Sequence, residues 1–133
     1  NGGNGSFSEG PVWYSVYVNY AKKNGIISAT DFNAVTKGNS AYNRYATRGE
    51  MAYIFRNAMP SDALPKINKV NSIPDVYTST KYRTAIYDLY KAGVLEGDAK
   101  HRFYPNNNIT RAEAAAIISR MAVKSLRSTF TLR

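Results

Sequence analysis

Two copies of a four-residue motif place an arginine beside a helix-capping pair. The motif reads Thr-Arg-Gly-Glu at residues 47–50 and Thr-Arg-Ala-Glu at residues 110–113. A threonine followed three residues later by a glutamate is a capping box, in which each side chain accepts a hydrogen bond from the other residue's backbone N–H and the helix begins after the threonine. Arg48 and Arg111 are therefore expected at the first position of two helices.

An arginine at that position needs a compensating negative charge. The positive end of the helix dipole disfavours a cation there by ~0.3–1 kcal/mol. A bound carboxylate, held between the guanidinium and the helix N–H groups, would supply the compensation. An ion pair with Glu50, Glu113 or another acid, or a side chain lying along the surface, would serve as well. The motif alone leaves both explanations open, an anion-binding site or an internal contact.

The two motifs lie in similar units that together span most of the chain. The same spacing occurs upstream of each motif: a tyrosine, an aliphatic residue four positions later, and a glycine seven positions after that. The spacing begins at Tyr14 in the first unit and at Tyr82 in the second. The units are residues 7–60 and 73–123. The remaining segments are residues 1–6, a Gly-rich linker or tag remnant; 61–72, a connector that holds a short helical turn; and 124–133, a tail with enough apolar residues to dock.

Each unit predicts helix, loop, helix. Apolar residues recur at i, i+3, i+4 and i+7, which gives each helix one apolar stripe. Gly25 and Gly93 stand where a left-handed C-terminal cap is needed. Two short helices bury little alone, so we expect one shared core in an all-α fold. The stripes are Tyr14, Tyr17, Val18 and Ala21; Met51, Ile54, Phe55 and Ala58; Tyr82, Ala85, Ile86 and Leu89; and Ala114, Ile117, Ile118 and Met121.

Composition excludes several classes of site and favours an anionic partner. Eighteen Lys and Arg against nine Asp and Glu give a formal net charge of +9 in 133 residues. The absence of cysteine excludes disulfides, thiol catalysis and Cys-ligated metals. His101 is the only histidine, and we expect it in an exposed loop without a catalytic partner. We predict no cofactor, no metal and no enzymatic activity.

The second unit resembles the S-layer homology domain. The resemblance rests on Ile73-Pro74-Asp75-Val76, on Gly93-Val94-Leu95-x-Gly97 and on the run from Phe103 to Glu113, while the first unit matches more loosely. It implies tandem repeats that form part of a pseudo-threefold helical bundle, here the last two of the usual three. It also implies an extracellular module that anchors a bacterial surface protein non-covalently to a secondary cell-wall polysaccharide, often one bearing pyruvate.

The resemblance also implies where the glycan is held. The motif arginines, Arg48 and Arg111, would contact the ligand. Asp75 would accept hydrogen bonds from sugar hydroxyls or orient an arginine, although a loop acid can equally cap backbone N–H groups. Gly97 would let a sugar ring approach the backbone, although a plain turn also requires glycine.

Aromatic residues near the start of the first helices are further candidates. Trp13 and Tyr82 align within one position, and an aromatic face can stack on a sugar ring. Core packing is the competing explanation, and it is favoured for Tyr82. The first unit has Glu9 where the second has Asp75, and Ala29 where the second has Gly97, which predicts a different or weaker groove there.

Two other functions compete with glycan binding. A face left open by a missing repeat would favour self-association or assembly with other surface-layer subunits. The basic balance and the 11 tyrosines would suit a nucleic-acid surface, but the Lys and Arg residues are scattered rather than clustered, which makes nucleic acid a poor candidate.

Overall fold

The computed structural model describes residues 15–33, 41–42 and 44–133. It divides into two compact units, Asn1–Arg44 and Tyr45–Arg133. The division does not follow the sequence repeat, because it leaves the second helix of the first repeat in the second unit.

The first unit contains helix α1 (Ser15–Lys23) and the short 3-10 turn η1 (Asp31–Asn33). Gly25 follows α1 with φ of 72°, the left-handed cap expected from the sequence. Phe32 is buried, and its ring meets Tyr42 edge-on at 6.4 Å between centroids. Tyr17, predicted on the buried stripe, is 54% exposed. Tyr14 lies outside the described residues.

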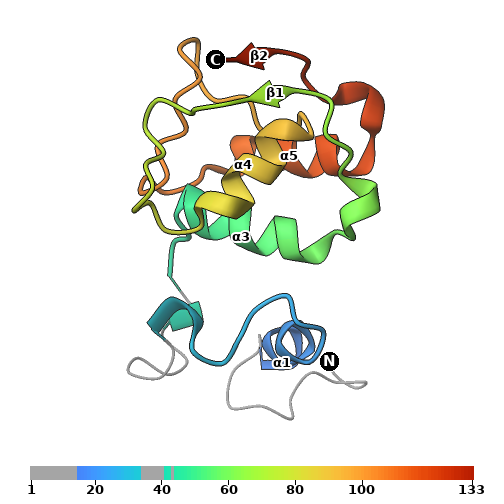
Figure 1. The fold of residues 1–133 in the computed structure, drawn as a ribbon. Helices are drawn as coiled ribbons and strands as arrows, with labels where there is room; N and C mark the ends of the chain where they lie inside the picture. Colours follow the sequence, from blue (N-terminus) through green and yellow to red (C-terminus); the bar gives the residue numbers. More distant parts are fainter. Residues whose placement is uncertain (1–14, 34–40, 43) are drawn as a thin grey trace. The chain divides into compact units, whose positions relative to one another are not determined.

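The second unit is built from helices α3 (Arg48–Ala58), α4 (Arg83–Lys91) and α5 (Arg111–Ala122) (Figure 1). Short 3-10 turns η3 (Ser61–Ala63) and η4 (Lys124–Leu126) follow α3 and α5. The predicted all-α fold is confirmed, with one addition. Strands β1 (Lys69–Val70) and β2 (Thr131–Leu132) pair in parallel beside the helices.

Both capping boxes form as predicted. Thr47 accepts a hydrogen bond from the Glu50 N–H, and the Glu50 carboxylate accepts one from the Thr47 N–H. The same reciprocal pair joins Thr110 and Glu113. The two helices therefore begin at the arginines, as the sequence indicates.

The core of the second unit joins residues of both repeats. Helix α3 packs against α4, and Ala52 of α3 is buried in the same cluster as Ile86, Leu89 and Tyr90 of α4. The side chains of these three residues are fully shielded from solvent. The cluster holds α3 in place, and with it Arg48.

Several expectations about individual positions in the second unit were wrong. The most buried residue of α3 is Ala52, which the predicted stripe omits, because a small side chain lets the helices approach. Ile118 is 52% exposed, because its side of α5 is left uncovered by the described part of the unit. His101 is half-buried rather than exposed, since its ring stacks on Phe130 at 5.2 Å.

The C-terminal segment docks through buried polar groups. Arg127 is 9% exposed and donates hydrogen bonds to the carbonyls of Arg120, Ala63 and Met121. Asn68 donates to the carbonyls of Tyr90 and Ser128 and accepts from the Phe130 N–H. Buried polar groups satisfied in this way fix the register of β1 and β2.

Candidate functional site

The two motif arginines have different surroundings. The Arg48 guanidinium donates from Nε to the Phe103 carbonyl at 2.6 Å and pairs through Nη1 with the Glu113 carboxylate. It also lies 4.8 Å above the Phe103 ring, and its side chain is only 13% exposed. Arg111 is exposed, and its guanidinium has no hydrogen-bond or ion-pair partner within the described part of the chain.

The backbone around the two arginines differs in the same way. The N–H groups of Arg48 and Gly49 donate to the carbonyls of Asn107 and Pro105, at 2.8 and 2.9 Å. For the described residues, no carbonyl takes the equivalent N–H groups of Arg111 and Ala112. Within the part of the chain that the structure describes, the start of α5, unlike that of α3, therefore retains N–H donors and a guanidinium without partners.

Glu113 serves both its own helix and Arg48. Partial burial acts to raise the pKa of this carboxyl group. The hydrogen bond from the Thr110 N–H and the positive charge of Arg48 outweigh that effect, so the pKa lies below its ordinary value. The carboxylate is ionised at neutral pH and is the internal partner that one of the two sequence-based explanations foresaw for Arg48.

Arg48 and Gly97 line the same small hollow, of about 140 Å³. Two ion pairs flank it, Arg48 with Glu113 and Arg120 with Glu96. Gly97 has φ of 78°, and a Cβ atom there would lie 2.6 Å from the Tyr90 hydroxyl oxygen and 2.7 Å from the Arg102 carbonyl oxygen. Packing alone therefore requires glycine at this position.

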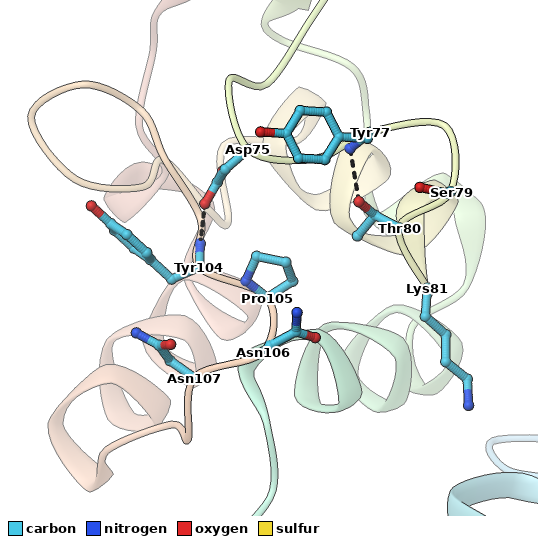
Figure 2. Close-up of a pocket in the computed structure, with 9 residues that line it drawn as sticks. All are labelled: Asp75, Tyr77, Ser79, Thr80, Lys81, Tyr104, Pro105, Asn106 and Asn107. Atoms are coloured by element: carbon cyan, nitrogen blue, oxygen red, sulfur yellow. Dashed lines mark hydrogen bonds between the residues drawn. The ribbon is translucent and has the colours of Figure 1, made fainter.

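Asp75 lies at a larger hollow, of about 530 Å³ (Figure 2). Its carboxylate accepts the N–H groups of Phe103 and Tyr104, at 2.7 and 2.6 Å. Asp75 thus ties the loop before α5 to the segment before α4. These two stretches form the sides of the hollow, whose lining is Asp75, Tyr77, Ser79, Thr80, Lys81, Tyr104, Pro105, Asn106 and Asn107.

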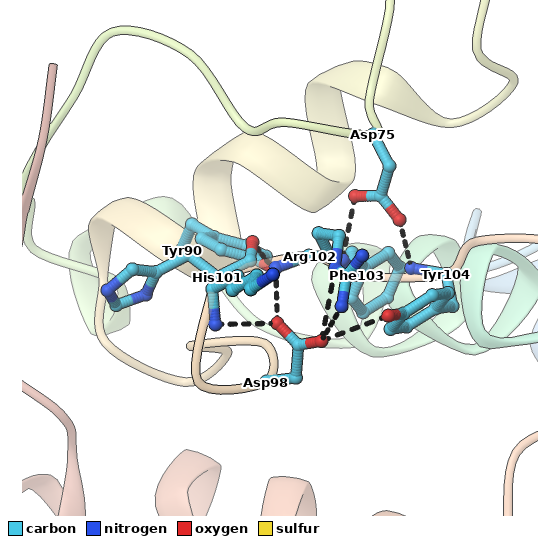
Figure 3. A network of polar contacts seen from close by, with 8 residues as sticks. Asp75, Tyr90, Asp98, His101, Arg102, Phe103 and Tyr104 are labelled. Atoms are coloured by element: carbon cyan, nitrogen blue, oxygen red, sulfur yellow. Dashed lines mark hydrogen bonds and ion pairs between the residues drawn. The ribbon is translucent and has the colours of Figure 1, made fainter.

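A polar network fixes Tyr104 at the edge of that hollow (Figure 3). Asp98 accepts hydrogen bonds from the N–H groups of Lys100 and Arg102, from the Arg102 guanidinium and from the Tyr104 hydroxyl. The bond from the Arg102 N–H contributes most to lowering the pKa of Asp98 to about 2. The bond to Asp98 in turn raises the pKa of the Tyr104 hydroxyl. The Tyr104 ring, 37% exposed, is thereby held in one orientation.

Tyr82 lies at a third hollow, also of about 530 Å³, between α3 and the start of α4. It is not on the helical stripe, because it precedes α4 in the left-handed conformation, with φ of 65°. Its ring lies 4.8 Å from that of Tyr53, tilted by 31°. Trp13 lies outside the described residues.

A family model for the S-layer homology domain matches residues 72–115. The match covers Asp75, Gly97 and the second capping box. Residues 72–115 are an S-layer homology domain. They form about half of the second structural unit, and such a domain is an anchoring module of cell-surface proteins.

Two curated relatives support the assignment. The chain is 32% identical over 101 residues to a surface-layer 125 kDa protein of Lysinibacillus sphaericus, a match that covers 74% of this chain and 8% of the relative. It is 31% identical over 118 residues to an amylopullulanase of Thermoanaerobacterium thermosulfurigenes, covering 85% and 6%. The chain therefore spans less than a tenth of either relative. No solved structure matched it.

The second unit thus distributes the predicted site residues over several places. Arg48 and Gly97 share one hollow, Asp75 lines a second, Tyr82 a third, and Arg111 stands apart on the surface. The sequence motifs did not indicate the other residues around Asp75. Their only signal was the run of polar and aromatic residues in two predicted loops: Tyr77, Lys81, Tyr104, Asn106 and Asn107.

The acids of the second unit are engaged internally. Residues 45–133 contain fourteen Lys and Arg and seven Asp and Glu. All of these acids except Asp62 accept hydrogen bonds or pair with arginines inside the unit. The second unit therefore has more cations than acids, and several of its cations have no acidic partner in the described residues, among them Lys81 and Arg111.

Sites of other kinds are not found in the described part of the chain. Its helices are too short or too polar to cross a membrane. It also holds no group of three or more Asp, Glu or His side chains that could bind a metal ion.

Proposed function

We propose that this module anchors its parent protein by binding an anionic secondary cell-wall polysaccharide, with pyruvyl groups as the acidic substituents. The S-layer homology assignment supports anchoring to the cell wall in general. The chemistry of the hollow beside Asp75 supports a saccharide ligand, and it is the observation on which the proposal chiefly rests. Residues 7–60 would act as a second, divergent repeat of the same kind.

The hollow beside Asp75 offers the groups that sugars need. Tyr77 is 63% and Tyr104 37% exposed, so each presents part of a ring face on which a pyranose can stack. Asn106 and Asn107 supply amide donors and acceptors for hydroxyl groups. Its volume of about 530 Å³ falls within the range of roughly 300–1,000 Å³ usual for small-ligand sites.

Two cations would recognise the acidic substituents. Lys81 lines the hollow, and its ammonium group has no acidic partner within the described residues. Arg111 combines a free guanidinium with the free N–H groups at the start of α5, a combination suited to a carboxylate. Asp75 would act as a positioning residue, because both its oxygens already hold the loop that carries Tyr104.

Calorimetric titration with a pyruvylated wall saccharide tests the proposal. We expect saturable binding, a clear loss of affinity in Lys81→Ala and Arg111→Ala, and a loss when the saccharide is stripped of pyruvate. Tyr77→Ala should also weaken binding, because it removes a stacking face. Tyr20→Ala is the matched control, since Tyr20 is 64% exposed but belongs to α1 of the first unit and is not among the residues that line this hollow.

The same titrations distinguish the competing functions. Binding that survives removal of pyruvate would contradict the role of the acidic group. A mass that rises with protein concentration, without saccharide binding, would favour self-association. Retention on nucleic acid with a steep salt dependence would favour a nucleic-acid surface.

A further inference from the structure

The hollow beside Tyr82 adjoins the hollow beside Asp75. The two have similar volumes, about 530 Å³ each, and Thr80 lines both. Figure 2 shows Thr80 and Lys81 at one side of the first hollow, directly before the residues that begin α4. A ligand longer than the first hollow can therefore continue past Thr80 into the second.

The second hollow has a lining suited to sugars. The stacked rings of Tyr53 and Tyr82 supply an aromatic surface, and Thr84 and Asn57 supply a hydroxyl and an amide. Arg56 also lines it, but its guanidinium is occupied. Nε pairs with Asp88 at 2.8 Å, and the other nitrogens donate to the Met59 carbonyl and the Ser61 hydroxyl.

Within the described residues, Arg83 is the cation lining the second hollow that has no acidic partner. Its guanidinium carbon lies 4.4 Å from the centre of the Tyr87 ring, which orients the side chain without satisfying its charge. Its Nε is buried and has no hydrogen-bond partner among the described residues. A buried donor on a charged group is costly to leave unpaired, and a guanidinium fork matches a carboxylate in geometry.

We propose that the second hollow is a further saccharide subsite, in which Arg83 binds an acidic substituent of a chain that also occupies the first hollow. This inference rests on the proposed function. It makes the module a reader of an extended stretch of polymer rather than of a single sugar unit. Two linked subsites gain affinity through effective concentration, so longer chains bind more tightly than short ones.

Titration with pyruvylated wall oligosaccharides of increasing length, using the whole chain, tests this subsite. We expect the wild type to bind fragments that span both hollows about 10-fold or more tighter than a single repeating unit. Arg83→Gln should lower the affinity for the long fragments by about 10-fold, while leaving the affinity for the single unit unchanged. Arg83→Lys, which retains the charge, should recover part of the loss.

A second variant separates ligand contact from folding. Thr84 is exposed on the first turn of α4 and lines the hollow, so Thr84→Tyr should block the subsite while leaving Arg83 and the core intact. It should also abolish the advantage of long fragments, with an unchanged melting temperature.

The outcomes distinguish this inference from the proposed function. If wild type binds short and long fragments equally, or if Arg83→Gln and Thr84→Tyr leave the length dependence intact, the second subsite is refuted and the proposed function stands. If wild type binds no fragment of any length, the proposed function fails and the subsite with it.

Discussion

Replacing the two motif arginines by alanine should affect stability differently: Arg48→Ala should destabilise the fold, whereas Arg111→Ala should not. Arg48→Ala removes a charged hydrogen bond to the Phe103 carbonyl, worth ~1.5–3 kcal/mol, and a cation–π contact worth ~0.5–1 kcal/mol. The ion pair with Glu113 adds ~0.2–1 kcal/mol, because the Glu113 side chain is 41% exposed. The expected loss is about 2–5 kcal/mol.

Arg111→Ala should be neutral or slightly stabilising. The side chain is exposed, and its removal takes a cation from the positive end of α5, an effect worth ~0.3–1 kcal/mol. Its capping box stays intact, because Thr110 and Glu113 are unchanged. Affinity for the wall saccharide should nevertheless fall in this variant.

Thermal unfolding followed by circular dichroism at 222 nm measures both effects. Arg48→Ala should lower the melting temperature by about 8 °C or more, since ~1 kcal/mol corresponds to ~4–8 °C in a unit of this size. The pKa of Glu113 is lower in the folded protein than its ordinary value of 4.5. The contribution of Glu113 to stability is therefore fully present above pH 4.5 and is lost as the pH falls through the lower pKa of the folded state. The difference between wild type and Arg48→Ala should therefore narrow in acid. Equal melting temperatures for Arg48→Ala and Arg111→Ala would refute the reasoning.

Three further predictions concern the loops around the hollows. Gly97→Ala should destabilise the second unit by more than the ~1–2 kcal/mol of left-handed backbone strain, because its added Cβ would also clash with neighbouring atoms. Gly25→Ala should destabilise the first unit by that strain alone, because nothing lies within 4 Å of its added Cβ. Chemical denaturation of each unit measures both effects. Carboxyl NMR should show Asp98 titrating near pH 2. The stabilising contribution of Asp98 should therefore be complete above its ordinary pKa of 3.8 and be lost only as the pH falls through about 2. A titration midpoint near pH 4 would contradict the hydrogen-bond network around Asp98. Asp75→Asn should cost ~1.5–3 kcal/mol in urea denaturation, because an amide offers one acceptor oxygen where two N–H groups need two.

Local patterns in the sequence predicted much of the framework. The capping boxes at Thr47 and Thr110, the left-handed glycines Gly25 and Gly93, and the family of residues 72–115 were all predicted correctly. These features depend on residues only a few positions apart, or on a motif long enough to be specific. Apolar periodicity was less reliable, as the exposure of Ile118 shows, because it identifies a face without showing what covers it.

The pairing of β1 with β2 had no sequence signal. Each strand has two residues, and their register depends on Asn68 and Arg127, which reach groups about 60 residues away. A hydrogen-bonded pair this short cannot be recognised from alternation. Tertiary contacts alone decided that the C-terminal segment would lie beside residues 69–70.

The contrast between the two arginines shows where the sequence ceased to be informative. The motif placed Arg48 and Arg111 at identical positions of two helices and left open whether each met a ligand or an internal acid. Arg48 finds its partners 55 and 65 residues away, in Phe103 and Glu113, while Arg111 has none among the described residues. The sequence by itself determined the family, the helix starts and the excess of positive charge. Only the tertiary structure decided which cations pair with an acid and which do not. Acids distant in the sequence neutralise some arginines, whereas the packing of the helices places other arginines too far from any acid of the described residues.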